Sequence, residues 1–254
     1  MVNIALTDKN YSYLGASIFV IFSLSLFIGL FLNEDASGVG TSNDFKNTWD
    51  YVLLLKNNYI IDSSQWTRLL PVHYIFLSFL HNIFNDIFIV RLIFCSLSVL
   101  VPYLFYINLK LKFNEVNKGK LLIVSAIIFI LPFFRSSAIW PNPHILSLIF
   151  LLTSIYFFQR WEFNFEKKIN LYLILHILFL ALTVYTRRYY IFFFIYNYLF
   201  YFKYLNIKNF FYISILILLL TLPGLLLIIK FPYYLETTGY SIKYYNTIPI
   251  ISSI

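Results

Sequence analysis

Long apolar runs constrain this chain more than any other feature of its sequence. Residues 11–32 are almost entirely apolar, and a helix needs about 20 such residues to cross the hydrocarbon core of a bilayer. Over the whole chain 60% of residues are hydrophobic and 12% are charged, whereas a soluble domain has roughly half and a quarter. Because a span made of one segment must satisfy its own backbone hydrogen bonds, the sequence predicts an all-α integral membrane protein.

The apolar runs predict a polytopic transmembrane helix bundle of about seven spans, in one domain covering residues 1–254. The predicted spans are residues 11–32, 87–109, 119–134, 144–159, 170–186, 189–203 and 209–229. Between the first two, residues 44–57 place Phe45, Trp49, Val52 and Leu53 on one helical face. This run is too short to span, so it predicts an interfacial helix. Residues 68–86 fit either a thin span or a second interfacial helix.

Basic residues in short loops indicate the orientation of the bundle, since such loops are retained in the cytoplasm. Three loops are basic; they carry Lys110, Lys112, Lys118 and Lys120, then Arg160, Lys167 and Lys168, then Lys203 and Lys208. All three fall on the side of the N-terminus only if residues 68–86 do not cross. We therefore predict that residues 68–86 are interfacial and that residues 33–86, 135–143 and 230–254 lie outside.

Net charge and cysteine content narrow the possible functions. The net charge of +8 is explained by Lys and Arg at the ends of spans and by anionic lipid, so we expect no nucleic-acid partner. The single cysteine, Cys95, excludes an internal disulfide and a cysteine-rich metal site. No phosphate-binding glycine loop, zinc-protease motif or serine-hydrolase elbow occurs in the sequence.

The predicted outer face collects most of the polar residues that need an explanation. These are Glu34, Asp35, Asp44, Arg68, His73, Arg91, Arg135, Asn142, His144, Arg187 and Arg188. Carboxylates act as general bases or metal ligands, and guanidinium groups bind phosphate. A phosphorylated lipid substrate would suit this combination. Each of these arginines could instead anchor the end of a span at the membrane interface, and Asp44 could only cap its helix. A further histidine, His176, lies inside a predicted span and fits a polar group of the core.

The order of four short motifs resembles the C superfamily of glycosyltransferases, membrane enzymes that use polyprenyl-phosphate sugars. The nearest similarity is to bacterial protein O-mannosyltransferase-like and arabinosyltransferase-like members. The motifs are DFKNTW (44–49), similar to the acidic start of the first outer helix; RLLPVHYIF (68–76), similar to a proline-containing rim segment; NDIFIVRL (85–92), which ends in Arg; and RSSAIWPNPH (135–144). In the last motif Asn142 stands where the family often has a second acid.

The resemblance implies a site at the outer face of the membrane. It implies that Asp44 is the catalytic base that removes a proton from the acceptor hydroxyl, with Asp35 as a second candidate or an orienting partner. The substrate-binding residues would be Arg68, His73, Arg91, Arg135, Asn142, His144, Arg187 and Arg188, the arginines facing the lipid phosphate. Family members continue with further spans and an outer domain, which would place residue 254 inside an outer loop.

These interpretations lead to a prediction of function and partners. We expect a multi-pass protein of a bacterial inner membrane that transfers a sugar from a polyprenyl-phosphate donor to a glycan, lipid or protein acceptor. The sequence requires no cofactor, although Asp35 and Asp44 could hold a divalent cation if they meet. The alternatives are a transporter or flippase for lipid-linked sugars and a membrane subunit without activity.

Overall fold

The computed structural model describes residues 8–58, 72–163 and 169–230, and these parts of the chain are helical without a strand. The all-α prediction is therefore confirmed. The α-helices are α1 (Asp8–Phe31), α2 (Gly40–Asn58), α3 (Val72–Phe84), α4 (Ile87–Ser98), α5 (Leu100–Lys112), α6 (Lys118–Ala126), α7 (Pro132–Ile139), α8 (Pro143–Phe163), α9 (Leu171–Thr186), α10 (Ile191–Tyr204) and α11 (Ile207–Lys230). Two short 3-10 helices, η1 (Ile127–Ile130) and η2 (Arg188–Tyr190), follow α6 and α9.

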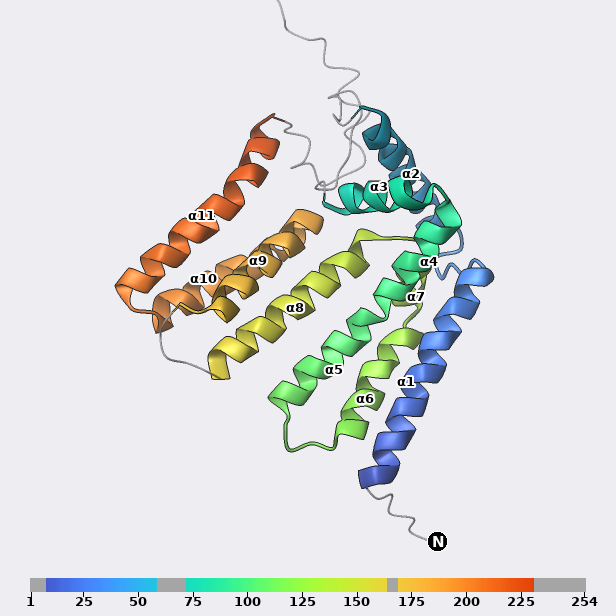
Figure 1. Cartoon of the computed structure of the whole chain (residues 1–254), viewed down its shortest axis with the longest axis horizontal. Coiled ribbons are helices and arrows are strands. Elements are labelled where there is room, and N and C mark those ends of the chain that lie inside the picture. Colours follow the sequence, from blue (N-terminus) through green and yellow to red (C-terminus); the bar gives the residue numbers. More distant parts are fainter. Residues whose placement is uncertain (1–7, 59–71, 164–168, 231–254) are drawn as a thin grey trace, which may run out of the picture.

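The helices form a bundle in which the chain runs back and forth between two ends (Figure 1). Contacts link α1 to α6, α6 to α5, α5 to α8 and α8 to α9, and α10 and α11 complete the bundle beside α9. The start of α1 and the turn between α5 and α6 lie at one end, and α2 and α3 lie at the other (Figure 1).

The number of spans is not confirmed by helix length and composition. Among the described residues, three helices are long and apolar enough to cross a membrane: 8–31, 87–112 and 207–224. A fourth is added if 118–130 and 132–139, bent by 68° at their junction, count as one span. The bend falls at Pro132, which begins α7 and lacks the N–H that would continue the preceding helix. At 16 residues, α9 is about 24 Å long, shorter than a typical hydrocarbon core.

The two helices predicted to be interfacial lie together at one end of the bundle. In α2, Phe45 and Val52 are 3% and 0% exposed, whereas Leu53, predicted on the same face, is 38% exposed. The helix predicted over 44–57 is present, and its apolar face is buried in part. Trp49 meets His81 of α3 edge-on, with ring centroids 4.9 Å apart. Helix α3 lies across the end of the bundle rather than along it (Figure 1). The start of the segment 68–86 lies outside the described residues.

Asparagine and aspartate side chains define where several helices begin. Asp86 accepts hydrogen bonds from the backbone N–H groups of Phe88 and Ile89 at the start of α4. Asn117 and Asn170 accept equivalent bonds at the starts of α6 and α9. Each cap pairs a backbone donor that the helix leaves unsatisfied. Asp86 is thereby explained as a helix cap.

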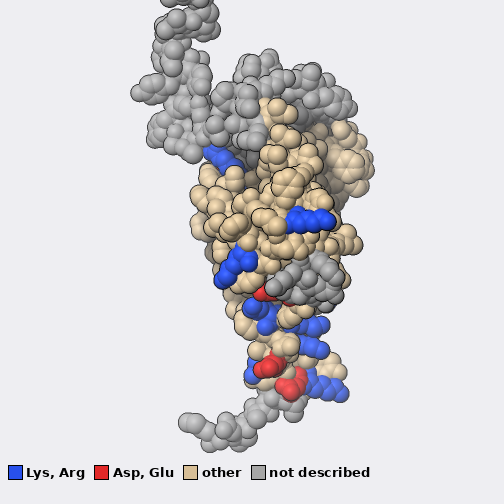
Figure 2. All heavy atoms as spheres, turned by 90° about the vertical axis from the view of Figure 1, so that its left-hand side faces the viewer, with Lys and Arg blue, Asp and Glu red and all other residues tan. Residues whose placement is uncertain are grey.

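The surface of the bundle matches its predicted environment. Figure 2 shows the face on the side of α11, where most of the visible surface is uncharged and Lys and Arg side chains are most numerous toward the lower end. In the view of Figure 1, that end holds the turn between α5 and α6. The long apolar helices and this surface are those of a multi-pass membrane protein.

Candidate functional site

Three predicted site residues meet where α8 begins and α9 ends. Arg187 follows α9, Asn142 precedes α8, and His144 lies in the first turn of α8. The Nη2 group of Arg187 lies 2.9 Å from Nε2 of His144 and donates to Oδ1 of Asn142 at 3.4 Å. The same Asn142 oxygen accepts from the backbone N–H of His144 at 3.1 Å. A proline on each side of Asn142 restricts this turn and holds the three groups together.

His73 of α3 lies next to this group and is completely buried. Burial lowers the pKa of His73 to about 3, and the positive charge of Arg187 acts in the same direction, while a backbone contact with Pro141 opposes it. Neither ring nitrogen makes a hydrogen bond of good geometry. The His73 ring is therefore neutral at physiological pH and lies close enough to Arg187 for the two groups to interact electrostatically.

Among the described residues, no carboxylate forms an ion pair with the guanidinium group of Arg187. Within the described part of the chain, the ion pair of at most 4 Å joins Arg135 to Glu34 and does not involve Arg187. Its Nε is buried without a hydrogen-bond partner. Burial lowers the pKa of Arg187, while the carboxylate of Asp44 is among the groups that raise it. A partly buried, unpaired cation is unfavourable, so this position favours an anionic ligand.

Asp44 and Asp35, the two candidate bases, have different surroundings. The oxygens of Asp35 accept from the hydroxyl and N–H of Ser37 and from the N–H of Ser42, at 2.7–3.0 Å. These bonds lower the pKa of Asp35 more than its burial raises it. Asp35 thus fastens the loop to the start of α2. Asp44 lies in the second turn of α2 and is exposed, and within the described ranges its carboxylate is left without a hydrogen bond.

Glu34 and Arg135 form a structural ion pair. Arg135 donates to both carboxylate oxygens of Glu34 at 2.6 Å, and also to the hydroxyl and carbonyl oxygens of Ser25 at 3.0 Å. The hydrogen bond from Arg135 is the main reason that the pKa of Glu34 is lowered. A Cβ at position 29 would lie 2.5 Å from Glu34, so Gly29 makes room for the pair. Arg135 therefore belongs to the scaffold, and its predicted role at a phosphate is not supported by these contacts.

Arg91 is likewise held in place by the protein. Its guanidinium carbon lies 3.7 Å from the ring centroid of Trp140, its Nε donates to the carbonyl of Ile139, and its Nη1 donates to Asn33. The Trp140 indole in turn donates to the Glu34 carbonyl. One Arg91 nitrogen, Nη2, is buried without a hydrogen-bond partner. Arg91 joins the start of α4 to the loop after α1, and its Nη2 is left for another group.

The remaining two predicted arginines are Arg68 and Arg188. Arg68 lies outside the described residues. The guanidinium of Arg188 lies 5.7 Å from the ring centroid of Tyr189, beside Arg187 in sequence. No group of three or more His, Cys, Asp or Glu side chains that could hold a metal occurs in residues 8–58, 72–163 and 169–230.

Comparisons with known proteins do not assign the chain. No protein-family description, curated protein or solved structure matches it. The geometry of the site is therefore the basis for any functional conclusion.

Sequence reasoning missed the residues that hold the scaffold together. Asn33 accepts a hydrogen bond from Arg91, and Ser25 accepts from Arg135. Trp140 stacks on Arg91 and donates to the carbonyl of Glu34. Ser136 accepts from the N–H of Ala36 at 2.7 Å. Trp140 and Ser136 are part of the motif RSSAIWPNPH, so the sequence shows that they lie within a few residues of Arg135. Ser25 lies within an apolar span, and nothing near it in the sequence indicates a contact with Arg135.

Proposed function

We propose that the chain is a membrane glycosyltransferase that moves a sugar from a polyprenyl-phosphate donor to an acceptor hydroxyl at the outer face of a bacterial inner membrane. The observation that carries this proposal is the Arg187 guanidinium, which has no carboxylate partner among the residues that the structure describes, yet lies within electrostatic reach of Asp44. A cation that can bind phosphate and a free carboxylate that can accept a proton are the two groups that the reaction needs.

Arg187 is a better candidate for the donor phosphate than Arg135 or Arg91. Arg135 is used by Glu34, and Arg91 is stacked on Trp140 with two of its nitrogens engaged. Arg187 shares Nη2 between an amide oxygen and an imidazole nitrogen, which hold it in position without neutralising its charge. A phosphate would supply that neutralisation through charge-assisted hydrogen bonds.

Asp44 is the better candidate for the base. Asp35 accepts three hydrogen bonds from its own loop, so its lone pairs are largely used, whereas the Asp44 carboxylate is exposed. In the proposed step Asp44 takes the proton of the acceptor hydroxyl as its oxygen forms a bond to the anomeric carbon. The bond from that carbon to the phosphate oxygen breaks, and polyprenyl phosphate leaves with the electron pair, stabilised by Arg187.

The test separates donor binding from transfer in the full chain reconstituted in liposomes. Turnover is the release of polyprenyl phosphate from mannosyl and arabinosyl donors in the presence of a cell-envelope acceptor fraction, and binding is measured with polyprenyl phosphate alone. We expect Asp44→Asn to lower turnover about a hundred- to ten-thousand-fold and to leave binding unchanged. Arg187→Gln should weaken binding about ten- to a hundredfold, because it removes charge-assisted bonds to phosphate.

Matched controls come from the same chain. Asp50→Asn changes another exposed carboxylate of α2, and Arg160→Gln changes an exposed arginine in the last turn of α8. Both should leave turnover and binding unchanged. Full turnover by Asp44→Asn would reject the base, and equal binding by Arg187→Gln would reject the phosphate site. Movement of the donor across the bilayer by the native chain, without release of polyprenyl phosphate, would favour a flippase.

A further inference from the structure

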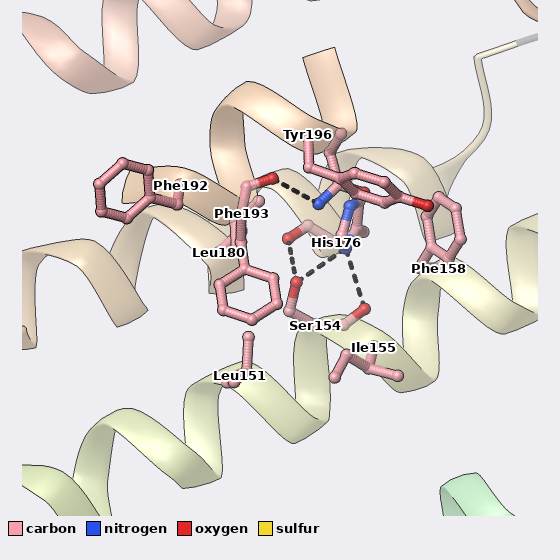
Figure 3. Close-up of a pocket in the computed structure, with 10 residues that line it drawn as sticks. Leu151, Ser154, Ile155, Phe158, His176, Leu180, Phe192, Phe193 and Tyr196 are labelled. Carbon is pink, nitrogen blue, oxygen red and sulfur yellow. Dashed lines mark hydrogen bonds between the residues drawn. The ribbon is translucent and has the colours of Figure 1, made fainter. Parts of the chain in front are cut away.

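A cavity of about 450 Å³ lies between α8, α9 and α10. Figure 3 shows side chains of the three helices facing one another around it. Its walls are largely apolar and aromatic, and they include Leu151, Ile155, Leu180, Phe192, Phe193 and Tyr196. The volume falls within the range of pockets that hold small molecules. The cavity therefore has room for a ligand with an apolar body.

Three polar side chains at the cavity are bonded within the protein. The Ser154 hydroxyl donates to the His176 carbonyl at 3.0 Å and lies 2.7 Å from Nδ1 of the His176 ring. The Asn197 side chain forms a hydrogen bond with His176, and its amide donates to the carbonyl of Phe193 at 2.7 Å. Because these groups already have partners, the cavity offers a ligand mainly apolar surface. Such a surface suits a hydrocarbon chain better than a polar molecule, which would lose its bonds to water.

The cavity borders the surface that α10 turns away from the bundle. Phe192 and Tyr196 are 71% and 65% exposed, on a helix whose sequence is apolar and aromatic along its length. In a membrane this surface meets lipid chains. A hydrocarbon chain can therefore enter the cavity from the bilayer, whereas a charged group is excluded by the cost of bringing an ion to that depth.

The cavity begins about two helical turns from the cluster around Arg187. On α8, Leu151 follows His144 by seven residues, so both lie on the same face of the helix, about 10 Å apart along its axis. On α9, Leu180 precedes Arg187 by the same number of residues, and Phe192 of α10 follows Arg187 by five. The same helices thus hold a cation at one end and an apolar cavity beside it.

We propose that one lipid occupies both places, with its anionic head group at Arg187 and its hydrocarbon chain in the cavity. Arg187 has no carboxylate partner among the described residues, so it favours an anion, and the cavity takes the chain that an anionic lipid brings. A free phosphate would leave the cavity unused, and an uncharged lipid would leave Arg187 unpaired. This inference rests on the anion-binding role of Arg187 in the proposed function, but it does not depend on sugar transfer.

The test compares two photoactivatable lipids that differ in the head group. Hexadecyl phosphate with a diazirine near the middle of its chain, and hexadecanol with the same diazirine, are each added to the full chain in phosphatidylcholine nanodiscs. Labelled residues are identified by mass spectrometry. We expect the phosphate to label α8 and α10 at the cavity about ten- to a hundredfold more strongly than the alcohol, which lacks charge-assisted bonds to Arg187.

Three variants connect the labelling to Arg187 and to the cavity. Arg187→Gln should lower cavity labelling by the phosphate to the level of the alcohol. Ile155→Trp narrows the cavity from α8 and should reduce labelling by the phosphate, whereas its affinity for ethyl phosphate, which has no long chain, should equal that of the native protein. Val124→Trp, at a 47% exposed position of α6, is the matched control and should leave labelling unchanged.

The outcomes separate this inference from the proposed function. Equal cavity labelling by phosphate and alcohol in the native protein would overturn the inference, as would phosphate labelling that persists in Arg187→Gln or in Ile155→Trp. If the native protein binds ethyl phosphate through Arg187 but hexadecyl phosphate does not label the cavity, the inference fails and the phosphate site stands. Sugar transfer is measured separately by turnover, so its absence would reject the proposed reaction without affecting the labelling result.

Discussion

Arg135 of α7 donates two hydrogen bonds of 2.6 Å each to the carboxylate of Glu34, which lies 101 positions earlier in the sequence. The same guanidinium donates to Ser25 in α1, so one side chain joins α1, the loop that follows it and α7. The loop leads directly to α2, which carries Asp44. The ion pair therefore positions the helix that holds the proposed base, although neither Glu34 nor Arg135 has a role in the proposed reaction step.

Loss of the ion pair should destabilise the bundle. Glu34→Gln removes the negative charge and leaves the Arg135 guanidinium without its counter-ion, and we expect the free energy of unfolding to fall by about 1–3 kcal/mol. The measurement is a denaturant titration of the purified protein in detergent, with Glu115→Gln in the exposed turn between α5 and α6 as the control. A loss no larger than that of the control would show that the pair adds nothing to stability.

His73 should make the protein less stable in mild acid. Its pKa is lowered by burial from 6.5 to about 3, so below pH 6.5 the unfolded chain binds a proton that the folded chain does not. Stability contributed by the neutral ring is thus present above pH 6.5 and is lost progressively toward pH 3. Unfolding measured from pH 7 to pH 5 should depend less on pH in His73→Phe. An unchanged pH dependence would mean that His73 is not buried as described.

The crossing of α1 and α6 should not tolerate a larger residue at position 119. A Cβ on Gly119 would collide with the backbone of Tyr11, and a Cβ on Gly15 would lie 2.5 Å from the carbonyl oxygen of Gly119. Since backbone cannot move aside as a flexible side chain does, Gly119→Ala should lower the free energy of unfolding by about 1–3 kcal/mol. Lys118→Ala, exposed one residue earlier, is the matched control. Equal effects of the two changes would contradict the close approach.

The two ends of the bundle should be accessible from opposite sides of the membrane. Val39, 67% exposed before α2, and Glu115, exposed in the turn between α5 and α6, are each replaced by Cys in a Cys95→Ala background. An impermeant thiol reagent added to intact cells should label Val39→Cys only, and permeabilisation should expose Glu115→Cys. Labelling of both from the same side would disprove the orientation.

Much of the fold was predictable because it depends on local pattern. Apolar runs indicate helices in lipid wherever they occur, and the spacing of Phe45 and Val52 predicted an amphipathic helix that the structure contains. The length of spans was less predictable. The run 119–134 is broken at Pro132, and α9 is short, since where a helix bends or ends depends on its neighbours as well as on its own composition.

The sequence by itself determined which chemical groups the candidate site could use, namely carboxylates, arginines and histidines on loops of the same predicted side. Only the tertiary structure decided which of them remain available. Glu34 and Arg135 form an ion pair. Asp35 accepts hydrogen bonds from Ser37 and Ser42. Arg187 contacts Asn142 and His144. Pairing of this kind joins residues far apart in the chain, and a side chain's partners depend on how helices pack in space. No pattern of nearby residues carries that information.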